Sequence, residues 1–197
     1  MAHFYFAEPE PDLIVGGLLG EYVKGPLQGQ YPAGLEQGVR LHRFIDSATD
    51  RHPSQSIVRE ILPKELGRYS SIINDMLCDH FLACSWAEFH STNLTEFTET
   101  CMNHLNASAH MLPEKGKRTL QRMQTERWTE QYLDIDNIYR ALVNIGKRFR
   151  RTNPMHRAPE LIPPVIQQIE PLSRQILGDT LDAVRKWRTD NTLDHPQ

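Results

Sequence analysis

The chain has 197 residues, of which 24% are charged, and a formal net charge of −3. This size and composition predict one soluble domain spanning residues 1–197. The negative charge argues against general nucleic-acid binding, although it permits a local basic patch. The apolar run LIVGGLL at 13–19 is too short to cross a bilayer. We therefore expect neither a nucleic acid nor a membrane as partner.

The three cysteines, Cys78, Cys84 and Cys101, form no CxxC pair. The first residues lack the basic stretch, apolar core and small-residue cleavage site of a signal peptide. An odd number of cysteines in apolar surroundings is typical of reduced thiols. We therefore expect a cytoplasmic location.

Helical spacing dominates the N-terminal half of the chain. Residues 2–7 fit either a short strand or the start of a helix. Pro11 and Asp12 predict the start of a helix that ends at the stop signal formed by Gly25 and Pro26. A loop is expected at 28–34, and three more helices are predicted at 35–50, 54–62 and 64–89.

The C-terminal half also has helical spacing, and helices are predicted at 93–111, 115–125 and 134–151. Within 158–189, Pro163, Pro164 and Pro171 predict either a kinked helix or two helices. Strand signals are scarce throughout, and the sequence has no internal repeat. The predicted fold class is therefore all-α, as a compact single-domain helical bundle.

His42, Asp46 and Asp50 follow one another at steps of four in the helix predicted at 35–50. Because residues four apart lie on one face of an α-helix, these side chains form one row. The simpler interpretation of this helix alone is a solvated face with a weak ion pair. The alternative is that imidazole and carboxylate bind a divalent cation, and this donor set suits Mn, Fe or Zn better than Ca.

Asp75, Asp79 and His80 lie in the helix predicted at 64–89, among apolar residues on every side. A helix that is apolar all round is buried, and a buried carboxylate is costly unless it is paired or binds a metal. An arginine partner for Asp75 and a carbonyl partner for His80 would explain these residues structurally. A polar pocket explains them better, and two such helices would form a mono- or dinuclear metal site.

Three stretches resemble the acyl carrier protein phosphodiesterases in order and spacing: GGLLGEYVKG (16–25), GVRLHRFIDSATDRHP (38–53) and NDMLCDHFLACSW (74–86). The motifs H-R-x-I-D-x-x-T-D and D-x-x-x-D-H-F-L are specific in combination. AHFYFA at the start also resembles the opening of the family, with His3 in place and Tyr5 where a second histidine is often found.

The resemblance implies an HD-domain-like, all-helical metal phosphohydrolase. Such an enzyme hydrolyses the phosphodiester that joins 4′-phosphopantetheine to a serine of holo-acyl carrier protein, which leaves the apo form. The implied cofactor is a divalent metal, foremost Mn²⁺, with Mg²⁺ and Fe²⁺ as alternatives. Acyl carrier protein is acidic, so a local basic surface is expected. Residues 115–118 with Arg122, and residues 146–151, are candidates, although each also fits an ordinary solvated helix end.

The matching positions imply roles for individual residues. The predicted metal ligands are His42, Asp46, Asp79, His80 and Glu21. Glu21 stands where the family commonly has aspartate. The predicted catalytic residues are Asp75, Asp79 and His42, with Asp75 as the general base or as support for a ligand. The predicted substrate-binding residues are Lys24, Arg40 and Arg43, which would neutralise the phosphate, although each also fits plain surface charge.

Two other functions fit the same side chains. An HD-like phosphohydrolase acting on a nucleotide or another small phosphoester would use the same ligands, but the sequence has no P-loop pattern. A non-catalytic helical binding protein would keep these charges for structural reasons. Neither a GxSxG motif nor a paired Cys–His pattern supports a serine or cysteine nucleophile.

Overall fold

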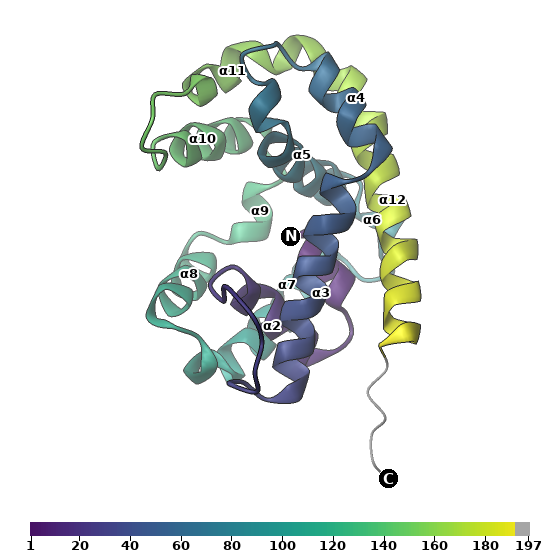
Figure 1. Cartoon of the computed structure of the whole chain (residues 1–197), viewed down its shortest axis with the longest axis vertical. Helices are drawn as coiled ribbons and strands as arrows, with labels where there is room; N and C mark the ends of the chain where they lie inside the picture. Colours follow the sequence, from purple (N-terminus) through teal and green to yellow (C-terminus); the bar gives the residue numbers. More distant parts are fainter. Residues whose placement is uncertain (192–197) are drawn as a thin grey trace.

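The computed structural model describes residues 1–191, and every regular element in this range is a helix, which confirms the predicted all-α class. Figure 1 shows the arrangement of the α-helices, which are α1 (Ala2–Ala7), α2 (Pro11–Gly20), α3 (Ala33–Asp50), α4 (Pro53–Ile61), α5 (Ser70–Cys84), α6 (Trp86–Phe89), α7 (Leu94–Ala107), α8 (Glu114–Thr125), α9 (Trp128–Gln131), α10 (Ile135–Gly146), α11 (Ala158–Leu161) and α12 (Ile166–Asp190). Short 3₁₀-helices are η1 (Gly67–Tyr69), η2 (Ala109–Met111), η3 (Pro154–Arg157) and η4 (Pro163–Val165). No described helix combines the length and apolarity that a membrane span requires.

The prediction of one helix over 64–89 is wrong, because this stretch contains η1, α5 and α6 in succession. The chain leaves the helical conformation at Ser85, where φ is −111° and ψ is 23°. The Ser85 hydroxyl accepts a hydrogen bond from the guanidinium of Arg174 on α12. A contact with a distant helix therefore marks the end of α5, and local sequence does not report it.

Residues 2–7, for which both a short strand and the start of a helix were expected as alternatives, form the helix α1. One boundary differs from expectation, because α2 ends at Gly20 rather than at Gly25. The intervening loop places Gly25 at a φ of 81°, a left-handed conformation that favours glycine. Near the C-terminus, α12 continues through Pro171 as one element, while Pro163 lies in the separate 3₁₀-helix η4. The chain is therefore not divided into two helices at Pro171.

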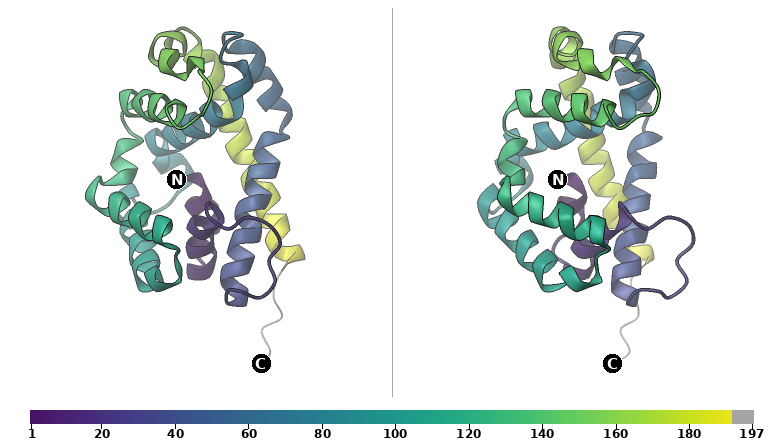
Figure 2. Two further views of the ribbon diagram at one scale, coloured as in Figure 1. Left: turned by 60° about the vertical axis from the view of Figure 1, so that its left-hand side comes forward. Right: turned by 90° about the vertical axis from the view of Figure 1, so that its left-hand side faces the viewer.

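Two hydrophobic cores lie next to each other and share α5 and α12. One core contains Cys78 of α5 and Ile176 of α12, together with residues from α1, α2, α3 and α7. The other contains Leu77 of α5 and Ile169 of α12, together with residues from α4, α10 and α11. Figures 1 and 2 show α12 running along the molecule past both groups of helices. The two shared helices thus fix the two halves against each other.

The helices α2 and α3 cross at very short range. A Cβ atom on Gly16 would lie 2.5 Å from the Cα of Gly38, and a Cβ on Gly38 would lie 2.7 Å from the Cα of Gly16. Atoms cannot approach this closely without a shift of the backbone, so the crossing depends on glycine in both helices. It sets the position of α3, and therefore of the polar row on α3.

Candidate metal centre

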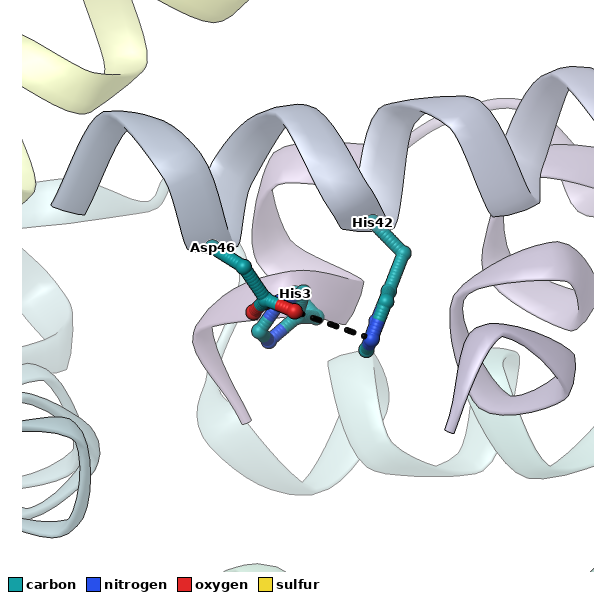
Figure 3. Close-up of side chains that lie close together, drawn as sticks. All are labelled: His3, His42 and Asp46. Atoms are coloured by element: carbon teal, nitrogen blue, oxygen red, sulfur yellow. Dashed lines mark hydrogen bonds and ion pairs between the residues drawn. The ribbon is translucent and has the colours of Figure 1, made fainter. Parts of the chain in front are cut away.

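His3, His42 and Asp46 point toward one another, as Figure 3 shows. The Nε2 atom of His3 lies 3.0 Å from Oδ1 of Asp46, and the Nε2 atom of His42 lies 3.4 Å from Oδ2 of Asp46. One donor atom from each side chain lies within 4.8 Å of the other two. His3 comes from α1, whereas the other two come from successive turns of α3. We call this group the His–His–Asp cluster.

His42 is the buried member of the cluster, with 5% of its surface exposed. Its ring lies directly on α2, since a Cβ atom on Gly20 would be 2.6 Å from Cδ2 of the ring. Burial, and secondarily the neighbouring His3, lower the pKa of His42 to about 4, although Asp46 opposes the shift. The imidazole is therefore neutral near pH 7, which is the form that binds metals.

The Asp46 carboxylate completes the cluster from the solvent side, where half of its side chain (50%) is exposed. Desolvation raises the pKa of Asp46, but the hydrogen bond from His3 and the charges of His3, His42 and Lys24 together lower it below the ordinary value. Asp46 is therefore anionic at neutral pH and carries a full negative charge into the cluster.

The donor set fits a divalent transition metal. Two imidazoles and a carboxylate meet, and Oε1 of Glu21 adds a second carboxylate 3.9 Å from Nε2 of His42. Mixed nitrogen and oxygen donors of this kind suit Mn, Fe and Zn better than Ca, which prefers oxygen alone. The residues that the structure brings together are therefore chemically suitable for the ion that the resemblance implies.

A pocket of about 720 Å³ opens beside the cluster and includes His3 and Asp46 in its lining. Five further carboxylates line it, those of Glu21, Asp50, Asp75, Asp79 and Glu126. Apolar side chains form other parts of the wall, among them Phe4, Met123 and Trp128. Small-molecule sites in proteins have volumes of about 300–1,000 Å³, so this pocket is large enough for a small ligand and offers it both polar and apolar walls.

Asp75 lies on α5 and lines the pocket, where it is exposed to water rather than buried as the sequence predicted. Desolvation raises the pKa of Asp75 to about 7; His3 opposes this rise, and the neighbouring carboxylates Asp79, Asp46 and Asp50 add to it. Near neutral pH this carboxyl group can therefore either accept or donate a proton.

Asp79 also lines the pocket, but its oxygens are engaged with α1. They accept a hydrogen bond from the α-ammonium group of Met1 at 2.7 Å, which is also an ion pair, and one from the backbone nitrogen of Ala2 at 2.8 Å. No side chain of α1 caps its own N-terminus. Asp79 therefore supplies the acceptors that the first turn of a helix needs, and it holds the helix that carries His3.

His80 does not join the cluster. Its Nδ1 atom lies 2.7 Å from the carbonyl oxygen of Tyr132 and 3.7 Å from Sγ of Cys84, and the ring is not part of the pocket lining. The ligand role predicted for His80 has no support in this geometry. The reason is angular, because His80 is turned by about 100° from Asp79 around the helix axis.

The three predicted phosphate-binding cations occupy different positions. The charge of Lys24 acts on both His42 and Asp46, so this lysine lies near the cluster. Arg40 instead pairs with the buried Glu36 at 3.1 Å. Arg43 donates to the carbonyl oxygen of Val23, also at 3.1 Å. The two arginines therefore contact Glu36 and the loop after α2, and none of the three cations belongs to the pocket lining.

Sequence reasoning left His3 out of the ligand set. No spacing rule relates a residue at the start of the chain to one on α3, because their proximity is tertiary. The one available signal was the AHFYFA stretch, which resembles the opening of the family and contains His3. The pocket wall formed by Met123 and Trp128 was also missed, since its residues come from the half of the chain with no functional motif.

Comparisons with known proteins agree with the motifs. The family model for acyl carrier protein phosphodiesterase matches residues 1–179. Similar proteins named acyl carrier protein phosphodiesterase come from Klebsiella pneumoniae (31% identity, 75% of this chain and 77% of the relative), Pectobacterium atrosepticum (30%, 75% and 77%) and Photorhabdus laumondii (27%, 79% and 79%). No solved structure matches the chain.

Proposed function

Since this chain belongs to the acyl carrier protein phosphodiesterase family, we propose that it hydrolyses the phosphodiester between 4′-phosphopantetheine and a serine of holo-acyl carrier protein. Water adds to phosphorus, the bond to the serine oxygen breaks, and apo-acyl carrier protein and 4′-phosphopantetheine are released. The observation that carries the proposal is the convergence of His3, His42 and Asp46 at the edge of a pocket.

In this proposal the His–His–Asp cluster holds a divalent cation, and Glu21 is close enough to contribute a further carboxylate. Mn²⁺ suits the donor set, and Mg²⁺ and Fe²⁺ remain alternatives. When bound, the cation neutralises charge on the phosphodiester and lowers the pKa of a water molecule. The predicted ligand roles of His42 and Asp46 are thus kept, and His3 takes the place of His80.

The side chains of the cluster are prepared for this role by their surroundings. Burial keeps His42 neutral, and the hydrogen bond with His3 helps to keep Asp46 anionic. Neither group then needs to lose a proton near pH 7 before it binds a cation. Lys24 lies near enough to add positive charge beside an anionic substrate.

Asp75 is the proposed general acid and base. It lines the pocket with His3 and Asp46, and its pKa of about 7 gives it both protonation states near neutral pH. It can take a proton from the attacking water and return a proton to the leaving serine oxygen. A cation nearby would lower the pKa of Asp75 and favour the carboxylate, which is the form that a base requires.

The remainder of the pocket suits the pantetheine arm, which is uncharged beyond its phosphate. The lining combines His3, Asp46 and Asp75 with apolar side chains that include Phe4, Met123 and Trp128. An arm packed on the apolar side chains would leave its phosphate to the polar ones. Binding energy from the arm would then position the scissile bond.

The test is to incubate the protein with holo-acyl carrier protein and Mn²⁺ and to follow the mass of the carrier. We expect the carrier to lose the mass of phosphopantetheine, and we expect no loss after chelation of the metal. An unchanged carrier in the presence of metal-loaded protein would refute the proposed function. Hydrolysis of bis(p-nitrophenyl) phosphate without action on the carrier would favour the alternative of a small phosphoester substrate.

A further inference from the structure

Residues 147–151, with the sequence KRFRR, carry four cations within five positions and follow directly on α10. We call this segment the basic loop. Lys147, Arg148, Arg150 and Arg151 are all exposed. The loop lies at the outer end of α10 in Figure 1. In a chain with a net charge of −3, such a concentration of positive charge is a local feature.

The backbone of the basic loop is held in place by hydrogen bonds. Nδ2 of Asn153 donates to the carbonyl oxygen of Gly146 at 2.8 Å, which closes the loop onto the end of α10. The backbone nitrogen of Arg148 donates to Ile145 at 3.0 Å, and that of Phe149 donates to Gly146 at 3.2 Å. The cations are therefore presented from a defined backbone.

The charges of the basic loop are not neutralised within the protein. Among residues 1–191, no carboxylate forms an ion pair with any of its four cations. The other basic cluster, on α8, differs, since Lys117 pairs with Glu114 at 2.8 Å and Arg122 pairs with Glu126 at 3.2 Å. Two of the four cations in the α8 cluster are therefore neutralised by neighbouring carboxylates, whereas, within the described part of the chain, none of the four in the basic loop is, so the basic loop has more positive charge to offer a partner.

An exposed aromatic side chain lies among these cations. Phe149 is 40% exposed, and its ring centroid lies 5.7 Å from that of Tyr69. The guanidinium of Arg68 lies 5.4 Å from the centre of the Tyr69 ring and adds a fifth cation to the same surface. Aromatic residues and arginine are enriched in protein–protein interfaces. The patch therefore has an apolar centre within a cationic rim.

The basic loop also adjoins the pocket. Arg148 and Ile145, at the end of α10, both contribute to the pocket lining. A macromolecule that inserts a prosthetic arm into the pocket past Arg148 would therefore bring its own surface beside the basic loop. Complementary charge on that surface would accelerate association and set its orientation.

We infer that the basic loop, together with Arg68 and Tyr69, is the docking surface for an acidic protein surface, namely the one that surrounds the modified serine of the carrier. This inference rests on the proposed function and assigns the partner contact to this face rather than to α8. A nucleic acid or an anionic membrane is the lesser fit, because the cations occupy one short arc around an aromatic centre and do not form an extended stripe.

The test compares two double charge reversals with equal changes in net charge. Arg150→Glu/Arg151→Glu alters the basic loop outside the pocket lining, and Arg185→Glu/Lys186→Glu alters exposed positions on α12. Binding of fluorescently labelled holo-carrier to metal-free, full-length protein is measured by anisotropy at several salt concentrations. We expect the loop variant to bind about tenfold more weakly or worse at low salt and to lose most of the salt dependence. The α12 variant should stay within about twofold of the parent.

Equal binding by the parent and the loop variant would overturn the inference. Equal losses of carrier binding in the loop variant and the α12 variant would also overturn it. The same holds if the loop variant loses binding to anionic vesicles and DNA as strongly as it loses binding to the carrier. The binding assay needs no turnover, so it is separate from the test of function. A metal-loaded parent that leaves the carrier intact, while the loop variant alone loses carrier binding, would refute the hydrolase proposal and keep the docking surface. Circular dichroism of both variants controls for folding.

Discussion

The helices α3 and α5 carry the same kinds of side chains, yet they contribute to the site in different ways. On α3, His42 and Asp46 are one turn apart and both reach the cluster. On α5, Asp75 and Asp79 are one turn apart and both line the pocket, but His80 contacts the Tyr132 carbonyl instead. A spacing of four residues therefore decides which side chains meet, and mere presence on one helix does not.

The two helices also differ in what holds their polar groups. The ring of His42 is buried against the backbone of α2 at Gly20. Asp79 is occupied by the first backbone nitrogens of α1. In the proposed site, α3 would thus supply ligands directly, whereas α5 would supply a titratable carboxyl group and a support for His3. The predictions below test this division of roles.

The largest effect is expected from His42→Ala, compared with His80→Ala as the matched change on α5. Loss of a group that merely supports a ligand costs about 10–100-fold in metal affinity or activity. Loss of a direct ligand should exceed this, so we expect turnover of holo-carrier to fall about a thousandfold or more. His80→Ala should retain turnover within a few-fold. Mn²⁺ titration followed by calorimetry, together with the carrier mass assay, provides the measurement. Equal losses in the two variants would break the distinction between α3 and α5.

A smaller loss is expected for Asp75→Asn, which removes the proposed acid and base but keeps the shape of the side chain. Turnover should fall about a hundredfold, while Mn²⁺ affinity changes little. In the parent, the rate should fall as the pH drops below the pKa of Asp75, because protonation removes the base. That pKa is about 7 without a cation and lower beside one. Its limb in the pH–rate profile should be absent from the variant, and a profile that keeps it would exclude this role.

Asp79→Asn should reduce Mn²⁺ affinity about tenfold, because α1 loses the negative charge at its N-terminus and His3 is less well held. Pulsed EPR of bound Mn²⁺ distinguishes support from direct ligation. If Asp79 acts through α1, the variant should lose the signal of one coordinated imidazole nitrogen. A variant that keeps both imidazole signals while losing affinity would instead identify Asp79 as a ligand, as its motif first suggested.

The smallest effect is expected for Gly20→Ala, which places a Cβ atom 2.6 Å from the His42 ring. Overpacking costs about 1–3 kcal/mol, and the better helix propensity of alanine returns up to about 1 kcal/mol. Gly17→Ala is the control, because its Cβ would meet only the Phe4 ring at 3.9 Å. Urea unfolding should show a loss of about 1 kcal/mol for Gly20→Ala and no loss for Gly17→Ala. A stable Gly20→Ala variant with unchanged metal affinity would show that the ring can move.

The sequence predicts features that depend on neighbours along the chain and misses those that depend on distant contacts. The start of α4 at Pro53 and the end of α3 near Asp50 follow from local signals. The break at Ser85 does not, because its partner is Arg174 on α12. The same rule applies to the site. His42 and Asp46 are recognisable as a pair from their spacing, whereas His3 reaches them only after α1 docks on α5.

The capping of α1 by Asp79 has a consequence for folding. The cluster takes one side chain from α1 and two from α3, so it is complete only when α1 is docked. A cation that binds this cluster would bind the folded chain and not the unfolded one. At a free concentration of 100 times its Kd, such a ligand would raise the free energy of unfolding by about 2.7 kcal/mol. The bound cation would then hold α1 in its docked position, and the melting temperature of the protein would rise with the concentration of Mn²⁺.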